Sequence, residues 1–510
     1  MAEVKRRRRL LLVVGLSLAL VAALLVTLAT RLTPFVRDRA VAALEERFDG
    51  DVQLQSLHVA VFPRLRVEGA GLLLRRRGRA DEPPLLAVGQ FSGEAGLAGL
   101  LGSPMRLRRV HVSDLDIYVP PRRQGSGGGR PGMPRTLAID EIQVERARLA
   151  VGTARPGRDP RVFDIHDLRL TPVGPNEPVA FEARLTNPAP RGEIQTSGRF
   201  GPWRRDEPSL TEIAGEYTFE KADLGTFKGI AGTLASTGRY TGALERIAVS
   251  GETRTPDFQI DTGSPVPLTT RFEAVVDGTD GDTYLNRVDA KIVESPLAAR
   301  GAIAEVPERK GREIRLDVTM TDARIQDVLR LAVKSEKPML SGGFQLKATL
   351  RIPPGDAKVI DRLRLDGTFA IEQARFADAS VHRQIETLSR RGRGRQGPPQ
   401  GEPVASDMGG RFAMQDGRIR FTPVVFSVSG ASVRLHGRYD VHGETLDFKG
   451  NLLLTARLSQ TVSGWKSWLA RPFDPLFRDG NRTVVPITVT GSRSDPKFGL
   501  DVKRALTPGD

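Results

Sequence analysis

Four short patterns in this sequence contain residues whose types and spacing could support catalysis or ligand binding. Gly392–Gly397 has the G-x-G-x-x-G spacing of a dinucleotide-binding loop, and Ser463–Lys466 has the S-x-x-K spacing of a serine nucleophile with its lysine. Asp277–Asp282 carries three aspartates, as a calcium-binding loop does, and His436 lies close in sequence to His442, as paired metal ligands do. Whether any pattern is a site depends on the elements that would position it.

The surroundings of these patterns argue against all four. The glycines follow a helical pattern rather than a strand, and no K-T-G or S-D-N element accompanies Ser463. The aspartate loop has Thr279 at its third position and a strand pattern from Leu285, so we predict a hairpin turn there. The two histidines lack further ligands, and cysteine is absent, which removes thiolate chemistry. We therefore predict a protein that is not an enzyme and has no metal site and no cofactor.

The chain is basic but poor in aromatic residues. Its net charge of +15 first suggests nucleic acid as a partner. However, the arginines are spread along the chain between apolar strand positions, and aromatic residues make up only 6%, which is poor material for base-stacking platforms. We therefore predict no nucleic-acid partner and a solvated basic surface that faces anionic lipid headgroups.

The N-terminus has the composition of a membrane anchor. An uncharged segment over residues 10–30 would cover about 30 Å as a helix, which matches the bilayer hydrocarbon. A cleaved signal peptide is the alternative, but the segment is longer than such peptides need and no clear A-x-A site follows it. The basic residues before the segment favour a cytoplasmic N-terminus and a periplasmic remainder; they are Lys5, Arg6, Arg7, Arg8 and Arg9.

A second helix is expected directly after the anchor, over Thr33–Phe48. Thr33 would be its N-cap and Pro34 its first helical residue. Apolar residues from Val36 to Leu44 fall on one face of this helix. We expect that face to cap the first strands, with the membrane surface as the alternative.

After residue 50 the dominant pattern is the period-two alternation of β-strands. It is clearest over 446–458, where one face is apolar and the other largely polar. We predict that this face lines a lipid-binding groove through Leu446, Phe448, Leu452, Leu454 and Leu458. His442–Glu444, before this run, is predicted to be a hairpin turn.

A short unit of the form apolar-x-apolar-x-x-small-x-apolar recurs along the chain. Its three-residue step shifts the alternation by one, so we predict a β-bulge or tight turn that returns the apolar residues to the same face. The copies are Leu65–Leu72, Ile142–Leu149, Gly215–Leu224, Val318–Ile325, Gly367–Phe376 and Gly410–Ile419, and Val110–Ile117 is a looser copy with Leu115 at the small position.

Other segments interrupt the strands. Residues 121–135 are rich in Gly and Arg and are predicted to be a flexible linker. Ala379–Arg391 has the pattern of an amphipathic helix and leads into a basic loop at 390–403. A later aromatic segment is expected to form a short helix over the end of a sheet, or to meet a membrane interface, through Trp465, Trp468 and Phe473.

In this order the segments resemble the AsmA-like family. The N-terminal likeness lies in the anchor, the amphipathic helix and D-V-Q-L-Q-S-L-H-V-A-V-F-P-R-L-R-V-E-G (Asp51–Gly69). The C-terminal likeness runs from L-D-G-T-F-A-I through D-G-R-I-R-F and L-H-G-R-Y-D to D-P-K-F-G-L-D. The resemblance implies a single-pass inner-membrane protein whose bulk is periplasmic, with kinship to TamB and the bridge-like lipid-transfer proteins. It implies no catalytic residues.

The fold class that we predict is mostly β: a long, curved antiparallel sheet that forms a groove, with one N-terminal transmembrane helix and a few short amphipathic helices. The expected domains are a basic cytoplasmic tail (1–9), the anchor (10–30), an N-terminal AsmA-like helix and β region (31–120), the linker (121–135), a middle β-rich region (136–364) and an AsmA-like C-terminal β region (365–510).

Two functions fit this prediction. In the first, a hydrophobic β-groove binds or conducts phospholipids or other envelope lipids between inner and outer membrane, and so supports outer-membrane biogenesis and lipid homeostasis. In the second, the protein is a non-catalytic scaffold of the envelope that buries the same faces between β-layers and binds outer-membrane or periplasmic partner proteins. The alternating pattern is identical for both functions, so the sequence leaves them open.

Overall fold

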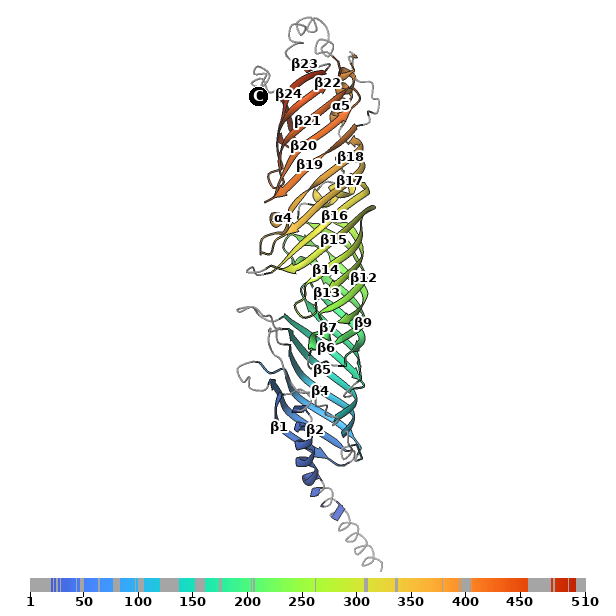
Figure 1. The fold of residues 1–510 in the computed structure, drawn as a ribbon, viewed down its shortest axis with the longest axis vertical. Coiled ribbons are helices and arrows are strands. Elements are labelled where there is room, and N and C mark those ends of the chain that lie inside the picture. The colour runs from blue at the N-terminus through green and yellow to red at the C-terminus, as the bar shows by residue number, and fades with distance from the viewer. Residues whose placement is uncertain are drawn as a thin grey trace, which may run out of the picture. The chain divides into compact units, whose positions relative to one another are not determined.

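The protein is built almost entirely from β-strands (Figure 1). The computed structural model describes residues 20–500, except for 22, 24–25, 28, 43, 46–49, 63–64, 77–82, 97, 100–104, 120–136, 152–160, 174–176, 203, 205–206, 262, 307–310, 335–337, 378, 394, 396–403, 405, 457–477, 480–481 and 494. The chain divides into two compact units, which are described separately. The first comprises Met1–Ala222, Thr237–Val249 and Val276–Gly281, and the second comprises Asp223–Ser236, Ser250–Val275 and Asp282–Asp510.

Besides the N-terminal helix over residues 29–42, the first unit contains nine strands and one short 3-10 helix among the described residues. They are β1 (Gly50–Ala60), β2 (Arg66–Arg76), β3 (Leu86–Ala95), β4 (Met105–Val119), β5 (Leu137–Val151), β6 (Arg161–Thr171), β7 (Val179–Pro188), β8 (Arg191–Phe200), η1 (Pro208–Leu210) and β9 (Glu212–Asp223). Three further strands supply residues to both units: β11 (Thr233–Ala243), β12 (Arg246–Ile260) and β13 (Val266–Val276).

The second unit continues the strand pattern with few helices. Its elements are η2 (Leu224–Thr226), β10 (Ile230–Ala231), β14 (Thr283–Ile292), β15 (Ser295–Glu305), β16 (Arg312–Arg324), α3 (Ile325–Ala332), β17 (Leu340–Ile352), α4 (Val359–Arg362), β18 (Arg364–Phe376), α5 (Ala379–Gly392), β19 (Ser406–Gln415), β20 (Arg418–Val428), β21 (Ala431–Asp440), β22 (Thr445–Leu454), β23 (Arg478–Asp479), β24 (Arg482–Ser492) and β25 (Pro496–Leu500). From β14 to β22 each strand pairs antiparallel with the next, and β24 lies between β22 and β25. The predicted mostly-β fold is confirmed.

One pairing departs from the antiparallel prediction. β4 and β5 run parallel, with Met105 opposite Leu137 and Val119 opposite Val151. A parallel pair requires the chain to travel back along the whole strand before the second strand begins. The connection over residues 120–136, which includes the predicted linker, supplies that return and lies outside the described residues.

A line of kinks crosses β1 to β6 in the first unit. On each strand the buried face steps by three residues instead of two, for example from Val112 to Leu115 and from Val144 to Ala147. The strand registers place the six steps next to one another on neighbouring strands. The apolar face therefore continues on both sides of this line of kinks. We call this line the kink row; it consists of Gln55, Gly71, Gly89, Asp114, Arg146 and His166.

Several copies of the recurring sequence unit contain such a kink, in both units. Four copies hold the residue before the small one in the left-handed backbone region, with positive φ at Asp114, Arg146, Lys221 and Gln373. The copy Gly410–Ile419 is instead a tight hairpin turn, because β19 and β20 meet through the positive-φ pair Asp416–Gly417. The predicted bulge or turn is therefore confirmed in these copies.

Within the kink row, Asp114 and Arg146 are directly opposite each other and form a bidentate ion pair. Arg146 Nε lies 3.0 Å from Asp114 Oδ1, and Nη2 lies 3.3 Å from Oδ2. The hydrogen bonds from Arg146 lower the pKa of the Asp114 carboxyl. Because both side chains are exposed, the pair mainly aligns the two kinks.

Substitutions at Asp114 test the backbone requirement of the kink row. Asp114→Val is expected to destabilise the strand by about 1–3 kcal/mol, because a β-branched residue resists the left-handed conformation. Asp114→Gly should change stability by less than about 1 kcal/mol, since glycine adopts positive φ without strain. Amide hydrogen exchange over Met105–Val119 measures both effects. Asp116→Val, at an exposed extended position of the same strand, is the control and should be neutral; equal effects at the two positions would contradict the strain argument.

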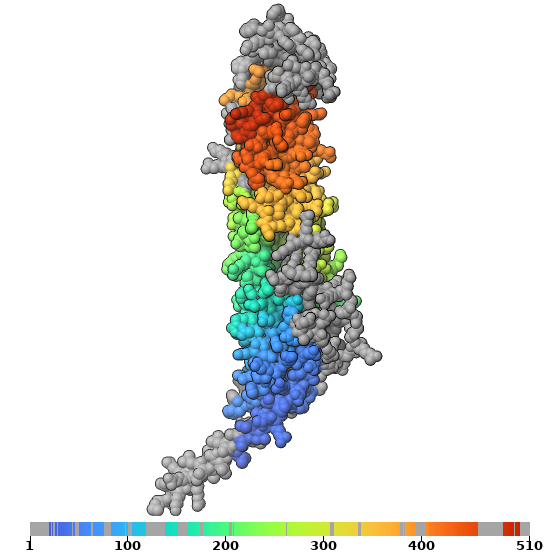
Figure 2. Space-filling model, turned by 90° about the vertical axis from the view of Figure 1, so that its left-hand side faces the viewer, coloured from blue at the N-terminus to red at the C-terminus, as the bar shows by residue number. Residues whose placement is uncertain are grey.

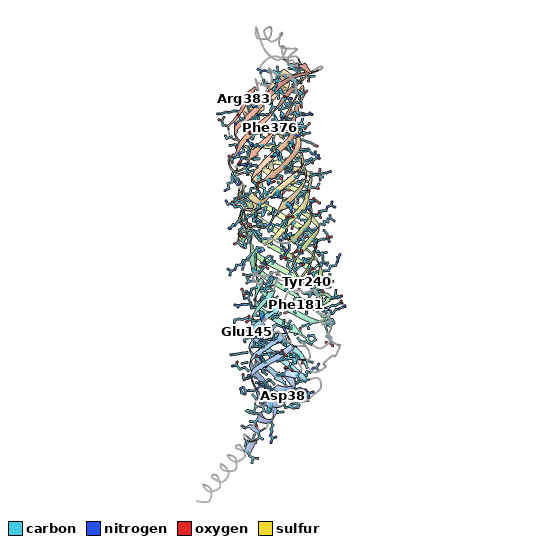
Figure 3. The ribbon with its side chains drawn as sticks, turned by 60° about the vertical axis from the view of Figure 1, so that its left-hand side comes forward. Asp38, Glu145, Phe181, Tyr240, Phe376 and Arg383 are labelled. Atoms are coloured by element: carbon cyan, nitrogen blue, oxygen red, sulfur yellow. The ribbon has the colours of Figure 1, made fainter. Side chains whose placement is uncertain are left out.

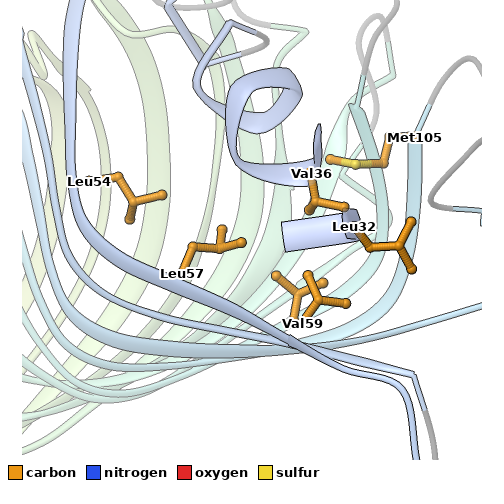
Figure 4. Close-up of a cluster of buried hydrophobic side chains, with 7 residues drawn as sticks. Leu32, Val36, Leu54, Leu57, Val59 and Met105 are labelled. Carbon is orange, nitrogen blue, oxygen red and sulfur yellow. The ribbon is translucent and has the colours of Figure 1, made fainter. Parts of the chain in front are cut away.

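The N-terminal helix packs against the first strands, as the capping prediction requires. Figure 4 shows Leu32 and Val36 on the helix within the curve of β1, beside Leu57 and Val59. Val36 is only 1% exposed. Arg37 Nη2 adds a hydrogen bond of 2.9 Å to the carbonyl of Leu54. The helix therefore closes one end of the apolar core of this unit.

The predicted helix start at Thr33 is wrong. The described backbone is helical without interruption over residues 29–42, and the Thr33 hydroxyl donates to the Ala29 carbonyl one turn earlier, at 2.9 Å. Thr33 is thus an interior residue that binds the preceding turn instead of capping the following one. Among the described residues, no helix is long and apolar enough to cross a membrane. The predicted anchor at 10–30 falls largely outside those residues, and Lys5–Arg9 fall wholly outside them.

Candidate functional site

The aspartate loop at 277–282 is a turn between β13 and β14, as predicted. Asp277 Oδ1 accepts the Thr279 backbone N–H at 2.8 Å, and Asp282 Oδ1 accepts the Glu305 backbone N–H at 2.9 Å. These carboxylates are thus engaged by the protein itself. No group of three or more His, Asp or Glu side chains that could hold a metal occurs in the described part of the chain.

The two histidines do not form a ligand pair. His436 lies on the exposed face of β21, whereas His442 lies in the β21–β22 turn, where its Nε2 is 2.8 Å from Asp361 Oδ1 of α4. Backbone hydrogen bonds, first from Gly443, and the Arg418 side chain lower the pKa of Asp440, which closes the same turn. The predicted hairpin is confirmed. Of the other two patterns, Gly392 ends α5, and Ser463 and Lys466 lie outside the described residues.

The candidate site is an extended apolar surface on one face of β19–β22 and β24. The strand registers align its side chains in five rows, each of which takes one residue from every strand in that order. We call this surface the C-terminal face. Its rows are Met414–Ile419–Tyr439–Leu446–Gly491, Phe412–Phe421–Gly437–Phe448–Val489, Gly410–Val424–Leu435–Gly450–Ile487, Met408–Phe426–Val433–Leu452–Val485 and Ser406–Val428–Ala431–Leu454–Thr483.

Three of the five residues in the second row of the C-terminal face are phenylalanines. The Phe421 ring lies 5.7 Å from that of Phe448 and 6.1 Å from that of Phe369 on β18. Gly437 stands opposite Phe448, and a Cβ on Gly437 would lie 2.9 Å from that ring. That Cβ would lie even closer to the backbone of β22, against the Asp447 carbonyl oxygen, so the glycine makes room for both the neighbouring strand and the ring.

Helix α5 covers one side of this face, next to β18, β20 and β21 (Figure 1). Its Ile385 packs with Val428, Ala431 and Leu454, which belong to the last row. Phe376 of β18, labelled in Figure 3 near Arg383 of α5, borders the same cluster. The helix thus seals the last row and the edge of the fourth row.

The remaining rows keep part of their surface accessible. Phe412, Phe421, Val424, Leu435 and Ile487 are half-buried, although each is a large apolar residue at the centre of a sheet. Figure 2 shows how closely the side chains of Ser406–Leu454, in orange, pack over this part of the unit. A sheet face that was closed against a second layer would bury such residues almost completely.

The opposite face of the same strands is charged and exposed. Arg418 pairs with Asp440 and Arg438 with Asp447, each at 3.1 Å across neighbouring strands. Exposed pairs of this kind contribute little to stability, so their main effect is to keep that face in water. The two faces therefore differ sharply in polarity, as the alternation predicts.

The structure brings four of the five predicted groove residues onto one face. Leu446 and Leu452 are half-buried, Phe448 is 9% exposed, and Leu454 is 5% exposed beneath α5. Leu454 is thus part of a closed core, which the strand pattern alone did not predict. The other predicted residues lie outside the described part of the chain: Leu458, Trp465, Trp468, Phe473 and Lys5–Arg9.

The sequence prediction missed the residues that make this face continuous, among them Phe412, Phe421 and Ile487. Their alternation is visible in the sequence, but only the register shows that they stand level with Phe448 and Leu435. Comparisons of the chain with family models, with curated proteins and with solved structures return no match.

Proposed function

We propose that this protein binds lipid acyl chains on its C-terminal face, as an AsmA-like, inner-membrane-anchored periplasmic protein that carries phospholipid between the inner and outer membranes. The observation that carries the proposal is a face of five aligned rows whose central apolar side chains stay partly accessible. Large apolar side chains that stay partly accessible side by side across a sheet are candidates for a binding site. The acyl chain of a lipid is a ligand that such a surface suits.

The energetics favour acyl chains as the ligand. Each methylene that leaves water contributes about 0.8 kcal/mol, or roughly 12 kcal/mol for a sixteen-carbon chain. A surface without directional hydrogen bonds can supply this free energy wherever the acyl chain lies on it. Binding that is strong in total but weak per atom suits a carrier, since the lipid can move along the surface in small steps.

Photo-crosslinking tests this proposal on the full-length protein in its membrane. A benzophenone amino acid at Phe421 should capture phospholipid in cells, and phospholipid should co-purify with the wild-type protein in native mass spectra. Arg420, the neighbouring residue on the charged face, is the matched control position and should capture none. Capture of a protein at Phe421 with no lipid would support the scaffold function instead, and equal capture at both positions would refute a lipid-binding face.

A further inference from the structure

The C-terminal end of α5 carries a cluster of arginines at the border of the C-terminal face. Arg391, Arg393 and Arg395 are exposed, and Arg390 is half-buried. In the described part of the chain none of the four pairs with a carboxylate. Glu386, the acidic residue of α5, is buried and already engaged. Among the described residues the cluster is thus a concentration of uncompensated positive charge.

The protein fixes this cluster in place. The Ser389 hydroxyl donates to the Ser429 carbonyl at 2.8 Å, and the Ala456 N–H donates to the Gly392 carbonyl at 3.0 Å. The helix end is therefore attached to the β20–β21 turn and to the end of β22. Beyond it the chain turns back, since the Arg395 N–H donates to the Arg390 carbonyl at 2.9 Å. The arginines consequently lie beside the last row of the C-terminal face.

One atom in this cluster lacks a partner. Arg390 Nε is buried, yet it donates to no acceptor in the described part of the chain. Buried donors are nearly always hydrogen-bonded, so the Arg390 guanidinium has hydrogen-bonding capacity that the described residues do not use. Cations at a helix C-terminus also offset the helix dipole, but that effect gives no partner to a buried Nε.

We propose that this arginine cluster binds the phosphate of an anionic lipid headgroup whose acyl chains lie on the C-terminal face. Guanidinium groups bind phosphate through paired, charge-assisted hydrogen bonds, and several of them converge here. The border position suits a lipid, because its headgroup must stay at the edge while its chains cover apolar side chains. This inference rests on the proposed function and adds a headgroup preference to it.

A competition between two lipids with identical acyl chains tests the inference. Full-length protein in a non-ionic detergent is mixed with equal amounts of phosphatidylglycerol and phosphatidylcholine, and native mass spectrometry gives the ratio of the two bound lipids. Both headgroups carry a phosphate, but the choline of phosphatidylcholine adds a positive charge that the arginines repel, so the anionic lipid should be enriched by about tenfold. A variant that combines Arg390→Gln, Arg391→Gln, Arg393→Gln and Arg395→Gln should lower the ratio to near one, with total bound lipid unchanged.

The control variant removes the same charge from the opposite face. It combines Arg364→Gln, Arg411→Gln, Arg420→Gln and Arg434→Gln, all exposed, and should keep the wild-type ratio. An equal loss of preference in both variants would overturn the inference, as would an unchanged ratio in the cluster variant. Glycerol phosphate that displaces phosphatidylglycerol at comparable concentration would show a site for free phosphates and overturn the lipid assignment. If lipid is retained without preference, only the inference fails; if neither lipid is retained, the proposed function fails.

Discussion

Leu435→Asp is expected to reduce lipid bound to the full-length protein by at least tenfold while the second unit stays folded. Leu435 is half-buried in the middle row of the C-terminal face, between Val424 and Gly450. In the lipid-free protein the carboxylate would remain partly hydrated, so the loss of stability should be about 1–3 kcal/mol. An acyl chain that covers the carboxylate must remove that water, which costs several kcal/mol more.

The amount of phospholipid bound per protein chain measures the loss of lipid binding, and hydrogen exchange over β19–β22 measures the loss of stability. His436→Asp is the matched control, because it introduces the same group at the next residue, on the exposed face. Retention of lipid by Leu435→Asp would place lipid elsewhere on the protein. Loss of amide protection across β19–β22 would instead indicate that Leu435 is packed against a second layer, as the scaffold function requires.

The second large effect is expected from shortening the connection between β4 and β5. The parallel register puts Val119 level with Val151, about 46 Å along the strand from Leu137. The chain has about 18 steps in which to return, with a reach of roughly 60 Å. Deletion of Gly125–Gly129 reduces that reach to roughly 45 Å, which leaves no length for the two turns that a return of about 46 Å also needs, so β5 can no longer pair with β4 in this register.

The expected loss of stability is of the order of 5 kcal/mol or more, because several buried aliphatic side chains lose their partners. Val110 and Val112 of β4 pack with Val144 of β5 in one cluster. Limited proteolysis and hydrogen exchange over β4 and β5 provide the measurement. Replacement of the same five residues by a Ser-Ala-Ser-Ala-Ser segment keeps the length and should leave protection intact. A deletion variant with normal protection would mean that the return path is shorter than the register requires.

Most of the strands could be predicted from sequence, because alternation reports which side chains share a face. The repeated unit predicted a bulge or tight turn, and Asp114, Arg146 and Gln373 adopt the left-handed conformation in three of its copies. The parallel direction of β5 was missed, since alternation is the same in either direction. The length of the connection between β4 and β5 was the feature of the sequence that could have indicated the parallel direction.

The candidate site was predicted less completely, for a physical reason. The pattern over 446–458 identifies which residues share a face, but not what covers them. The helix over Ala379–Arg391 was predicted correctly, yet its amphipathic pattern does not specify the strands on which it lies. Consequently Leu454, predicted to line the groove, is 5% exposed beneath α5, whereas Phe421 and Leu435 remain accessible.

The alignment of the rows in the C-terminal face has a consequence for motion. Neighbouring strands are about 4.8 Å apart, so an acyl chain that lies along one row, across the strands, meets one residue of that row at every strand. An acyl chain is longer than this spacing and can touch the next strand before it leaves the last one. Each step then exchanges only a few methylene contacts, and the barrier to sliding is a small part of the total binding free energy. A lipid could therefore slide along this surface over low barriers while its total binding free energy stays large.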